Sequence, residues 1–285
     1  MSHDAANRVV VVTGANAGIG KAAAHQLAES GHHVVMVCRD TQKAEAAAAD
    51  IRRQTPNGTI TVVTGDLSSI AGVRALAQKL LADFPKIHVL INNAGVWMTR
   101  RQLNDDGLEM TFMVNHIAPF MLTALLVDRM KTSAPARVVM VNAGLYVNGE
   151  ADLERLPTGE NFHRFKTYMH SKLLNVYVSN EFARRLNGTG ITVNALHPGV
   201  IRTNLGNSGG PLGLLLKGIK MLWKKPEDGA KPVVNLAISP ELDDLNGAYY
   251  NEMEPMDIAA NAQDPETQQR IWEHAEKTAQ LTVNV

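Results

Sequence analysis

RVVVVTGANAGIG, residues 8–20, is the stretch that decides the fold of this 285-residue chain. Its opening run of valines is typical of a strand buried on both faces of a parallel sheet. Gly14, Gly18 and Gly20 follow the strand, and an alanine-rich helix is expected over 19–30. A strand, a glycine-rich turn and a helix N-terminus bring backbone N–H groups close to a bound phosphate, and a β-carbon would block that approach. The spacing Gly-x-x-x-Gly-x-Gly therefore favours a phosphate-binding turn, with an ordinary glycine-rich β–α turn as the alternative.

Strands and helices alternate along the rest of the chain. The residue patterns predict strands at 8–13, 32–38, 59–66, 87–95, 136–144 and 190–199. Helices are expected at 19–30, 41–54, 69–84, 108–131, 165–187 and 263–280. Strands that alternate with helices indicate an α/β fold, a Rossmann-type doubly wound parallel sheet flanked by helices. No linker or repeat interrupts the pattern, so we expect a single domain over 1–285.

The composition excludes several classes of protein. Lys plus Arg and Asp plus Glu are both 28, so no net field attracts nucleic acid or anionic lipid. The ten histidines show no metal-binding spacing, and we expect no metal. The single cysteine, Cys38, fits a reducing compartment, and the polar start MSHDAANR has no apolar signal-peptide core. We therefore expect a soluble, cytoplasmic protein.

Polar residues and glycines collect where the predicted strands end, at 13–14, 39–40, 65–66, 92–95, 142–144 and 197–199. In doubly wound sheets, ligands bind outside these carboxyl ends. An acidic residue after the second strand binds the ribose 2′-hydroxyl of NAD, whereas an arginine accommodates the 2′-phosphate of NADP. Arg39 at this position favours NADP(H). Asp40 comes next, and it either contacts a ribose or caps the following helix.

Tyr168 and Lys172 stand four residues apart in the predicted helix over 165–187, so both lie on one face. A phenol is a suitable proton donor for a carbonyl oxygen, but its ordinary pKa of ~10 is high for work near neutrality. A nearby ammonium favours the phenolate and lowers that pKa. The pair is a candidate catalytic site, although most Tyr-x-x-x-Lys pairs are surface pairs.

Taken in order, these motifs resemble the short-chain dehydrogenase/reductase family nearly end to end. The matching pieces are TGANAGIG at 13–20, Asp66-Leu67, NNAG at 92–95, Asn115, Tyr168-x-x-x-Lys172, and Pro198-Gly199 followed by Thr203. CRD at 38–40, the long insert before Tyr168 and HSKLLNV at 170–176 look most like the retinol-dehydrogenase-like branch. Its bacterial members include ketoreductases that act on polycyclic polyketides.

The resemblance implies a role for each matching residue. Tyr168 would exchange a proton with the substrate oxygen, and Lys172 would bind the nicotinamide ribose and lower the tyrosine pKa. Asn115 would kink its helix and hold a water that connects the lysine to solvent; without the family, it is equally a helix asparagine bonded to its own backbone. The residues implied in cofactor binding are Gly14, Asn16, Ala17, Gly18, Ile19, Gly20, Arg39, Asp66, Leu67, Asn93, Ala94, Gly95, Tyr168, Lys172, Pro198, Gly199, Val200 and Thr203.

The chain departs from the family at the end of the fifth strand. The family's catalytic serine falls on Ala143, which has no side-chain hydrogen bond to give to a substrate oxygen. The loss of one such donor can cost about 100-fold in rate. Three explanations stay open: Asn142 is a surrogate donor, the substrate itself helps through a neighbouring hydroxyl, or the protein is an impaired or inactive catalyst.

Two segments are expected around the substrate. The insert 145–164 should border the site, and 204–225, apolar with glycines near its start, is interpreted as a lid over an apolar substrate. Its alternatives are a packed helix and a membrane-surface helix, and we do not expect the latter. Further candidates for the pocket wall are Trp97, Met98, Arg100, Tyr146 and His197.

These residues together predict an NADP(H)-dependent oxidoreductase. The expected reaction is hydride transfer to or from a carbonyl or secondary alcohol on a bulky hydrophobic molecule, such as a polycyclic aromatic polyketide, a steroid or a retinoid. The alternative is a cofactor-binding sensor or scaffold without turnover, which Ala143 supports. The assembly is expected to be a monomer or a homodimer, since family members pair through the two long helices, here 108–131 and 165–187.

Overall fold

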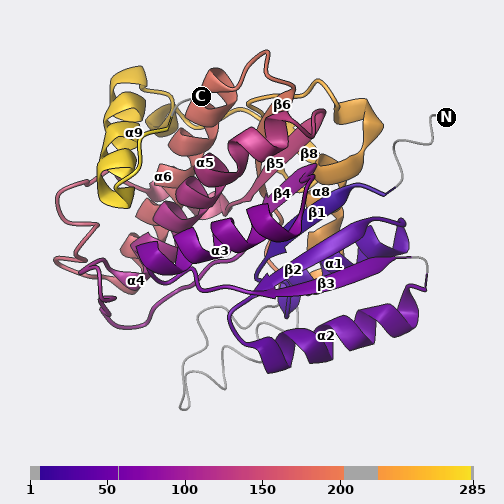
Figure 1. The fold of residues 1–285 in the computed structure, drawn as a ribbon. Coiled ribbons are helices and arrows are strands. Elements are labelled where there is room, and N and C mark those ends of the chain that lie inside the picture. The colour runs from indigo at the N-terminus through magenta and orange to yellow at the C-terminus, as the bar shows by residue number, and fades with distance from the viewer. Residues whose placement is uncertain (1–6, 57, 202–223, 284–285) are drawn as a thin grey trace.

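Strand β1 (Val9–Thr13) lies inside an eight-stranded sheet of order β3-β2-β1-β4-β5-β6-β7-β8 (Figure 1). The computed structural model describes residues 7–56, 58–201 and 224–283. Neighbouring strands pair in parallel except β7 and β8, which are antiparallel. The predicted doubly wound, mostly parallel sheet is therefore confirmed. The other strands are β2 (His33–Cys38), β3 (Thr59–Thr64), β4 (Val89–Asn92), β5 (Ala136–Val141), β6 (Ile191–His197), β7 (Tyr249–Asn251) and β8 (Glu254–Met256).

Helices cover both faces of the sheet because alternate residues of each strand point to opposite sides. Val10 and Val12 belong to the apolar core under α1 (Gly18–Glu29), α2 (Thr41–Gln54) and α8 (Pro226–Ile238). Val11 belongs to the core on the other face, under α3 (Ile70–Asp83), α5 (Ala118–Lys131) and α6 (Arg164–Arg185). Both faces of β1 are buried, as its valines predicted.

The predicted helix over 108–131 runs unbroken over 110–131 but is not α-helical throughout. A short helix α4 (Met110–Phe112) passes into a π-helical turn, η2 (Met113–Ile117), before α5 begins. Asn115 is the central residue of that turn. The segment Met110–Lys131 is long and apolar enough to cross a membrane, yet 78% of its most apolar window is buried inside the fold. Its hydropathy is explained by its place in the core.

Three elements near the C-terminus were not predicted. Strands β7 and β8 have three residues each, too few to show a period, and α8 contains Pro232. Helix α9 (Pro265–Ala279) matches the expected helix over 263–280. Its Trp272 packs against Phe120 of α5 and Phe182 of α6 at centroid distances of 5.1 and 4.7 Å. Helix α9 therefore covers part of the face that the two long helices present.

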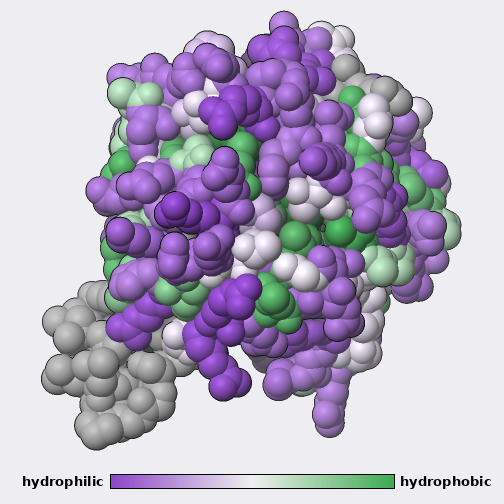
Figure 2. All heavy atoms as spheres, turned by 90° about the vertical axis from the view of Figure 1, so that its left-hand side faces the viewer, coloured by the Kyte–Doolittle hydropathy of each residue, from purple (hydrophilic) through white to green (hydrophobic). Residues whose placement is uncertain are grey.

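The surface on this side of the molecule is mainly hydrophilic, with its apolar residues in small separate patches (Figure 2). The expected lid over 204–225 falls almost entirely on residues 202–223, which lie outside the described residues, as does Thr203.

Candidate active site

A cavity of about 810 Å³ opens at the carboxyl ends of the parallel strands. It gathers residues from the glycine-rich turn to the start of α6, which lie far apart in the sequence. The predicted site residues that line it are Gly14, Asn16, Ala17, Gly18, Ile19, Gly20, Arg39, Asp66, Leu67, Asn93, Ala94, Gly95, Asn142, Ala143, Tyr168, Lys172, Pro198, Gly199 and Val200. The elongated set of loops that forms the cavity fits a long ligand lying across the rim.

The glycine-rich turn leaves no room for a β-carbon at Gly14 or Gly20. Gly14 has a φ of +67°, a left-handed conformation that favours glycine. A β-carbon on Gly20 would lie 2.4 Å from both the Asn93 Nδ2 atom and the Gly14 carbonyl oxygen. Asn93 itself donates from Nδ2 to the Thr13 carbonyl at 2.7 Å, so the ends of β1 and β4 are held together. This backbone arrangement fits a closely approaching phosphate group.

Helix α1 begins at this turn without a protein cap. Its N-cap residue, Ala17, gives no side-chain hydrogen bond, and no acidic residue stands in the first turn. By contrast, Asp40 and Ser69 cap α2 and α3 through hydrogen bonds to Lys43 N and Gly72 N. The first N–H groups of α1 therefore face the cavity with their hydrogen-bonding capacity and the positive end of the helix dipole available to an anion.

Arg39 and Asp40 follow β2, and the structure gives them different surroundings. Asp40 caps α2, with Oδ1 accepting from Lys43 N at 3.0 Å, so the capping alternative is what the geometry supports. Arg39 is exposed at the cavity wall and forms no ion pair with any residue of the described ranges. Asp66, at the end of β3, accepts from the backbone and side chain of Ser68 at 2.9 and 2.8 Å while it lines the cavity.

Tyr168 and Lys172 lie on one face of α6 and enter the cavity together. The Lys172 Nζ atom is 5.8 Å from the centre of the Tyr168 ring and donates to the Val141 carbonyl at 3.1 Å. Burial lowers the pKa of Lys172 to about 8. Burial also raises the pKa of Tyr168 above its ordinary value. Within the described residues the Lys172 ammonium hydrogen-bonds to the Val141 carbonyl, and the expected lowering of the tyrosine pKa by Lys172 stays a prediction.

Asn115 lies behind the cavity and joins three segments. Its side chain accepts from Val96 N at 2.7 Å, donates to the Val96 carbonyl at 2.9 Å and reaches Ser171 Oγ at 3.2 Å. Its main-chain carbonyl, freed by the π-helical turn, accepts from Asn175 Nδ2 at 2.5 Å. The resemblance implies a water at Asn115; the contacts here tie the loop after β4 to α6.

The serine position holds no hydrogen-bond donor in its side chain. Ala143 follows β5 at the cavity wall and is 8% exposed. Asn142 donates from Nδ2 to the Lys172 carbonyl at 3.1 Å, and its Oδ1 is buried without a partner. Its amide is thus engaged with the backbone of α6, which does not favour its use as a surrogate donor.

The wall residues were only partly predicted. Trp97 and His197 line the cavity, whereas Met98 and Arg100 do not. Tyr146 is fully buried, and its hydroxyl accepts from Ala259 N at 3.0 Å. Leu145, the first residue of the insert 145–164, lines the cavity as expected for that insert, whereas sequence reasoning missed Phe165, because an aromatic beside a helix start is usually read as core packing.

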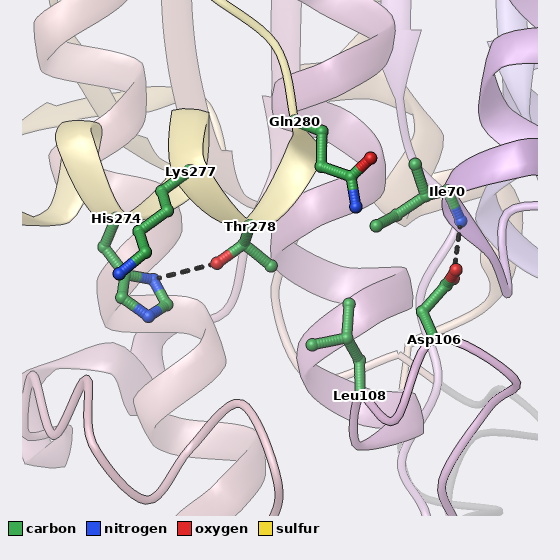
Figure 3. A pocket seen from close by; sticks show the side chains of 7 residues that line it. All are labelled: Ile70, Asp106, Leu108, His274, Lys277, Thr278 and Gln280. Carbon is green, nitrogen blue, oxygen red and sulfur yellow. Dashed lines mark hydrogen bonds between the residues drawn. The ribbon is translucent and has the colours of Figure 1, made fainter.

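A second cavity, of about 340 Å³, lies between α9, the start of α3 and the turn before α4 (Figure 3). His274 and Thr278 point toward each other on α9, and Asp106 bonds the first backbone N–H of α3. None of the predicted site residues lines it. Within the described ranges, no cluster of three or more His, Cys, Asp or Glu residues could hold a metal ion.

The family follows from comparison with known proteins. A model described as short chain dehydrogenase matches residues 8–210, and the chain belongs to this family of oxidoreductases. It is retinol-dehydrogenase-like within the family. Retinol dehydrogenase 14 of Mus musculus is 39% identical over 94% of this chain and 85% of its own length. Retinol dehydrogenase 13 of Homo sapiens is 40% identical over 93% of this chain and 82% of its own length.

Solved structures agree in fold. An uncharacterised protein from Mycobacterium paratuberculosis has a TM-score of 0.78 at 29% identity, covering 98% of this chain and 96% of that one. The active-site complex of Pseudomonas aeruginosa RhlG with NADP has a TM-score of 0.70 at 26% identity, covering 86% and 94%. The NADP in this neighbour and the donor set at the turn after β1 indicate a nicotinamide cofactor.

Proposed function

We propose that this protein is an NADP(H)-dependent ketoreductase that transfers hydride between the nicotinamide and a carbonyl or secondary alcohol on a bulky hydrophobic substrate. The observation that carries the proposal is the convergence of Tyr168 and Lys172 at the wall of one cavity, with Asn115 directly behind them. Reduction is the favoured direction, because a preference for the 2′-phosphate couples an enzyme to the reduced cofactor pool.

The bound nicotinamide would supply the hydride, and the remaining chemistry falls to the chain. Tyr168 holds a proton on its hydroxyl oxygen and donates it to the substrate oxygen as the carbonyl carbon is reduced. Because burial raises the pKa of this phenol, the proton is retained well above neutral pH, which suits an acid more than a base. Lys172, anchored at Val141, would bind the nicotinamide ribose.

The preference for NADP(H) over NAD(H) rests on Arg39. Its guanidinium stands at the end of β2, while the neighbouring carboxylate of Asp40 is committed to the cap of α2 and to Lys43. An acidic group is therefore not available to select a 2′-hydroxyl, and a guanidinium is well suited to bind a phosphate.

The apolar character of the substrate rests on the cavity wall beyond the cofactor residues. Trp97, Leu145 and Phe165 line it, with Leu145 and Phe165 41% and 42% exposed. Large apolar side chains that stay exposed at a pocket are typical of a surface that binds an apolar ligand. The relatives named retinol dehydrogenases support a retinoid as the first substrate to test, beside steroids and polycyclic aromatic ketones.

A sensor or scaffold that binds the cofactor without turnover is the second candidate. Ala143 favours it, since no side-chain donor other than Tyr168 is assigned to the substrate oxygen. The two functions differ in a single respect: the sensor binds NADPH but oxidises it with no carbonyl compound.

NADPH oxidation against retinal, steroid ketones and polycyclic aromatic ketones tests the proposal. Ala143→Ser is run beside the wild type and is expected to raise kcat about tenfold or more on ketones that carry no neighbouring hydroxyl. Gly144→Ala, which changes the adjacent residue without adding a donor, is the control. NADPH binding without turnover by the wild type and the serine variant would reject the ketoreductase and favour the sensor.

We also propose a cytoplasmic location and a monomer. Cys38, the single cysteine of the chain, has no partner for an internal disulfide, and this supports a reducing compartment. The packing of α9 on α5 and α6 through Trp272 supports the monomer over a homodimer formed by those helices. Light scattering after size-exclusion chromatography tests the assembly.

A further inference from the structure

Trp97 lies flat on the ring of the proposed proton donor. The indole and the phenol of Tyr168 are stacked, with ring centroids 4.6 Å apart and planes inclined by 9°. On α6, Phe165 meets the indole edge-on at 5.1 Å and 81°. The guanidinium of Arg164 lies 4.7 Å from the centre of Phe165. Trp97 is therefore the inner member of an aromatic group that reaches from the cavity mouth to Tyr168.

This tryptophan does not serve the general interior. It belongs to neither of the two apolar cores, it is half-buried, and it lines the cavity. Its aromatic contacts are with Tyr168 and Phe165 alone among the described residues. A side chain placed for stability would be expected to pack into one of the cores, so the position of Trp97 needs another explanation.

The backbone beside Trp97 is held by two hydrogen bonds. Both polar groups of Val96 bond to the Asn115 side chain, its N–H to Oδ1 at 2.7 Å and its carbonyl to Nδ2 at 2.9 Å. The same Asn115 reaches Ser171, whose hydroxyl donates to the Tyr168 carbonyl at 2.8 Å. The loop that carries the indole and the helix that carries the phenol are thus fixed to one asparagine.

The hydroxyl of Tyr168, in contrast, makes no hydrogen bond to any residue within 7–56, 58–201 or 224–283. Among the residues that the structure describes, only packing holds the phenol ring. The family's catalytic serine would be a second donor that helps to align the substrate oxygen, but position 143 is alanine. Correct alignment then depends on the direction in which the Tyr168 hydroxyl points.

We propose that Trp97 is the positioning residue of the active site: the indole, fixed through Asn115, holds the phenol of Tyr168 in the orientation that the reaction needs. This inference rests on the proposed ketoreductase function. It assigns to Trp97 the role of aligning the proton donor with the substrate oxygen, which a serine would otherwise help to do. Trp97 touches no reacting atom; it acts through Tyr168.

The test compares Trp97→Leu, Trp97→Phe and Phe165→Leu with the wild type. Leucine removes the flat ring but keeps an apolar side chain, and kcat for ketone reduction is expected to fall about 10- to 100-fold, a larger change than that in KM, with NADPH affinity nearly unchanged. Phenylalanine restores a ring that can stack, so most of the kcat should return. Phe165→Leu removes the edge-on contact with the indole but leaves both stacked rings in place, and it should alter KM more than kcat.

A second readout needs no turnover. The ionisation of Tyr168 is followed by its ultraviolet absorbance, as the difference between each protein and the same protein carrying Tyr168→Phe. Titratable groups near Tyr168 are Lys172 on α6 and Tyr249 on β7, with Arg164 over the neighbouring Phe165 and His197 of β6 near Lys172, and all stay in place. Loss of the indole admits water to the phenol, so its pKa should fall in Trp97→Leu and stay high in Trp97→Phe.

The two readouts separate the possible failures. Wild-type kcat and wild-type tyrosine ionisation in Trp97→Leu would overturn the positioning role while leaving the ketoreductase intact. If the wild type reduces no ketone but the tyrosine pKa is lowered in Trp97→Leu, the proposed function is rejected. The inference that the indole packs on the phenol of Tyr168 would then still stand. Equal loss of kcat in Trp97→Phe and Trp97→Leu would also reject positioning by the stacked ring.

Discussion

The two ends of the cavity are built in different ways. At the end near β1, backbone does the binding: Gly14 and Gly20 keep side chains away, and the uncapped N–H groups of α1 face the space. At the end near α6, side chains form the binding surface: Tyr168 is stacked on Trp97, and Lys172 is buried beside them. A backbone site recognises any phosphate of the right shape, whereas a site of side chains can be altered one residue at a time. The cofactor end should therefore be the general part of this protein and the α6 end the particular one.

Tyr168→Phe should give the largest effect and affect only the α6 end. Removing the proton donor is expected to lower kcat by about 1,000-fold, with the NADPH dissociation constant changed less than about threefold. The matched control is Tyr177→Phe on the same helix, whose hydroxyl donates to the Asn261 carbonyl at 2.8 Å away from the site. Steady-state kinetics and cofactor fluorescence give the two quantities. Turnover that survives the change at 168 would mean that the proton comes from elsewhere.

Gly14→Ala should instead affect the cofactor end of the cavity, by weakening the binding of NADPH. A β-carbon there would lie 3.0 Å from the Ala94 Cα atom, on a residue whose φ is +67°. NADPH affinity is expected to fall about 10- to 100-fold, because the turn must shift away from the phosphate. Gly188→Ala, at φ +79° with nothing within 4 Å, carries the same backbone strain far from the cavity. If both variants bind NADPH alike, the turn after β1 does not hold the cofactor closely.

Arg39→Ala should separate the two cofactors. A guanidinium that binds the 2′-phosphate contributes about 1.5–3 kcal/mol, so NADPH affinity should fall roughly tenfold or more while NADH affinity stays unchanged. Lys43→Ala, which removes the neighbouring cation that pairs with Asp40, is the control and should weaken NADPH little. Isothermal titration with both cofactors measures the ratio. An equal loss for NADH would show that Arg39 binds a part that the cofactors share.

Lys172→Met should give the smallest effect, a change in the free energy of unfolding. The dependence of this change on pH is diagnostic of the buried charge. Burial lowers the pKa of Lys172 from 10.5 to about 8, so the folded protein releases a proton that the unfolded chain keeps between those values. The buried ammonium therefore costs stability fully below pH 8, and this cost falls as the pH rises toward 10.5. Methionine should raise the free energy of unfolding by about 1–2 kcal/mol near neutral pH, and the gain should shrink in alkaline solution.

Urea unfolding at neutral and alkaline pH measures this difference. Lys166→Met, a change of the same kind at an exposed position of α6, is the control and should leave stability nearly unchanged. A lower stability for the variant at 172 would indicate that the hydrogen bond to Val141 outweighs the burial of the charge.

The difference between the two ends also decided what the sequence could predict. The valines of β1 indicate a buried strand, and the glycines at 14, 18 and 20 indicate a tight turn before a helix. The sheet, the turn and its helix were therefore correctly predicted. Tyr168 and Lys172 were brought together by helix periodicity. The residue pattern alone did not predict the π-helical turn at Asn115, because its residues are as apolar and helix-compatible as their neighbours; only the family resemblance implied a kink there. The stack of Trp97 on Tyr168 was equally hidden, since it depends on how a loop returns to a helix 71 positions later.

The central place of β1 has a consequence for how the chain is made. One edge of β1 pairs with β2 almost at once, but the other waits for β4, where Val10 aligns with Val89. At ordinary rates of synthesis, the second partner emerges roughly 4–16 seconds after the first valines. During that time an apolar strand edge is exposed on the nascent chain, which is a template for pairing with other chains. Recovery of soluble protein should therefore depend on chaperones that are present during synthesis more than on the stability of the finished fold.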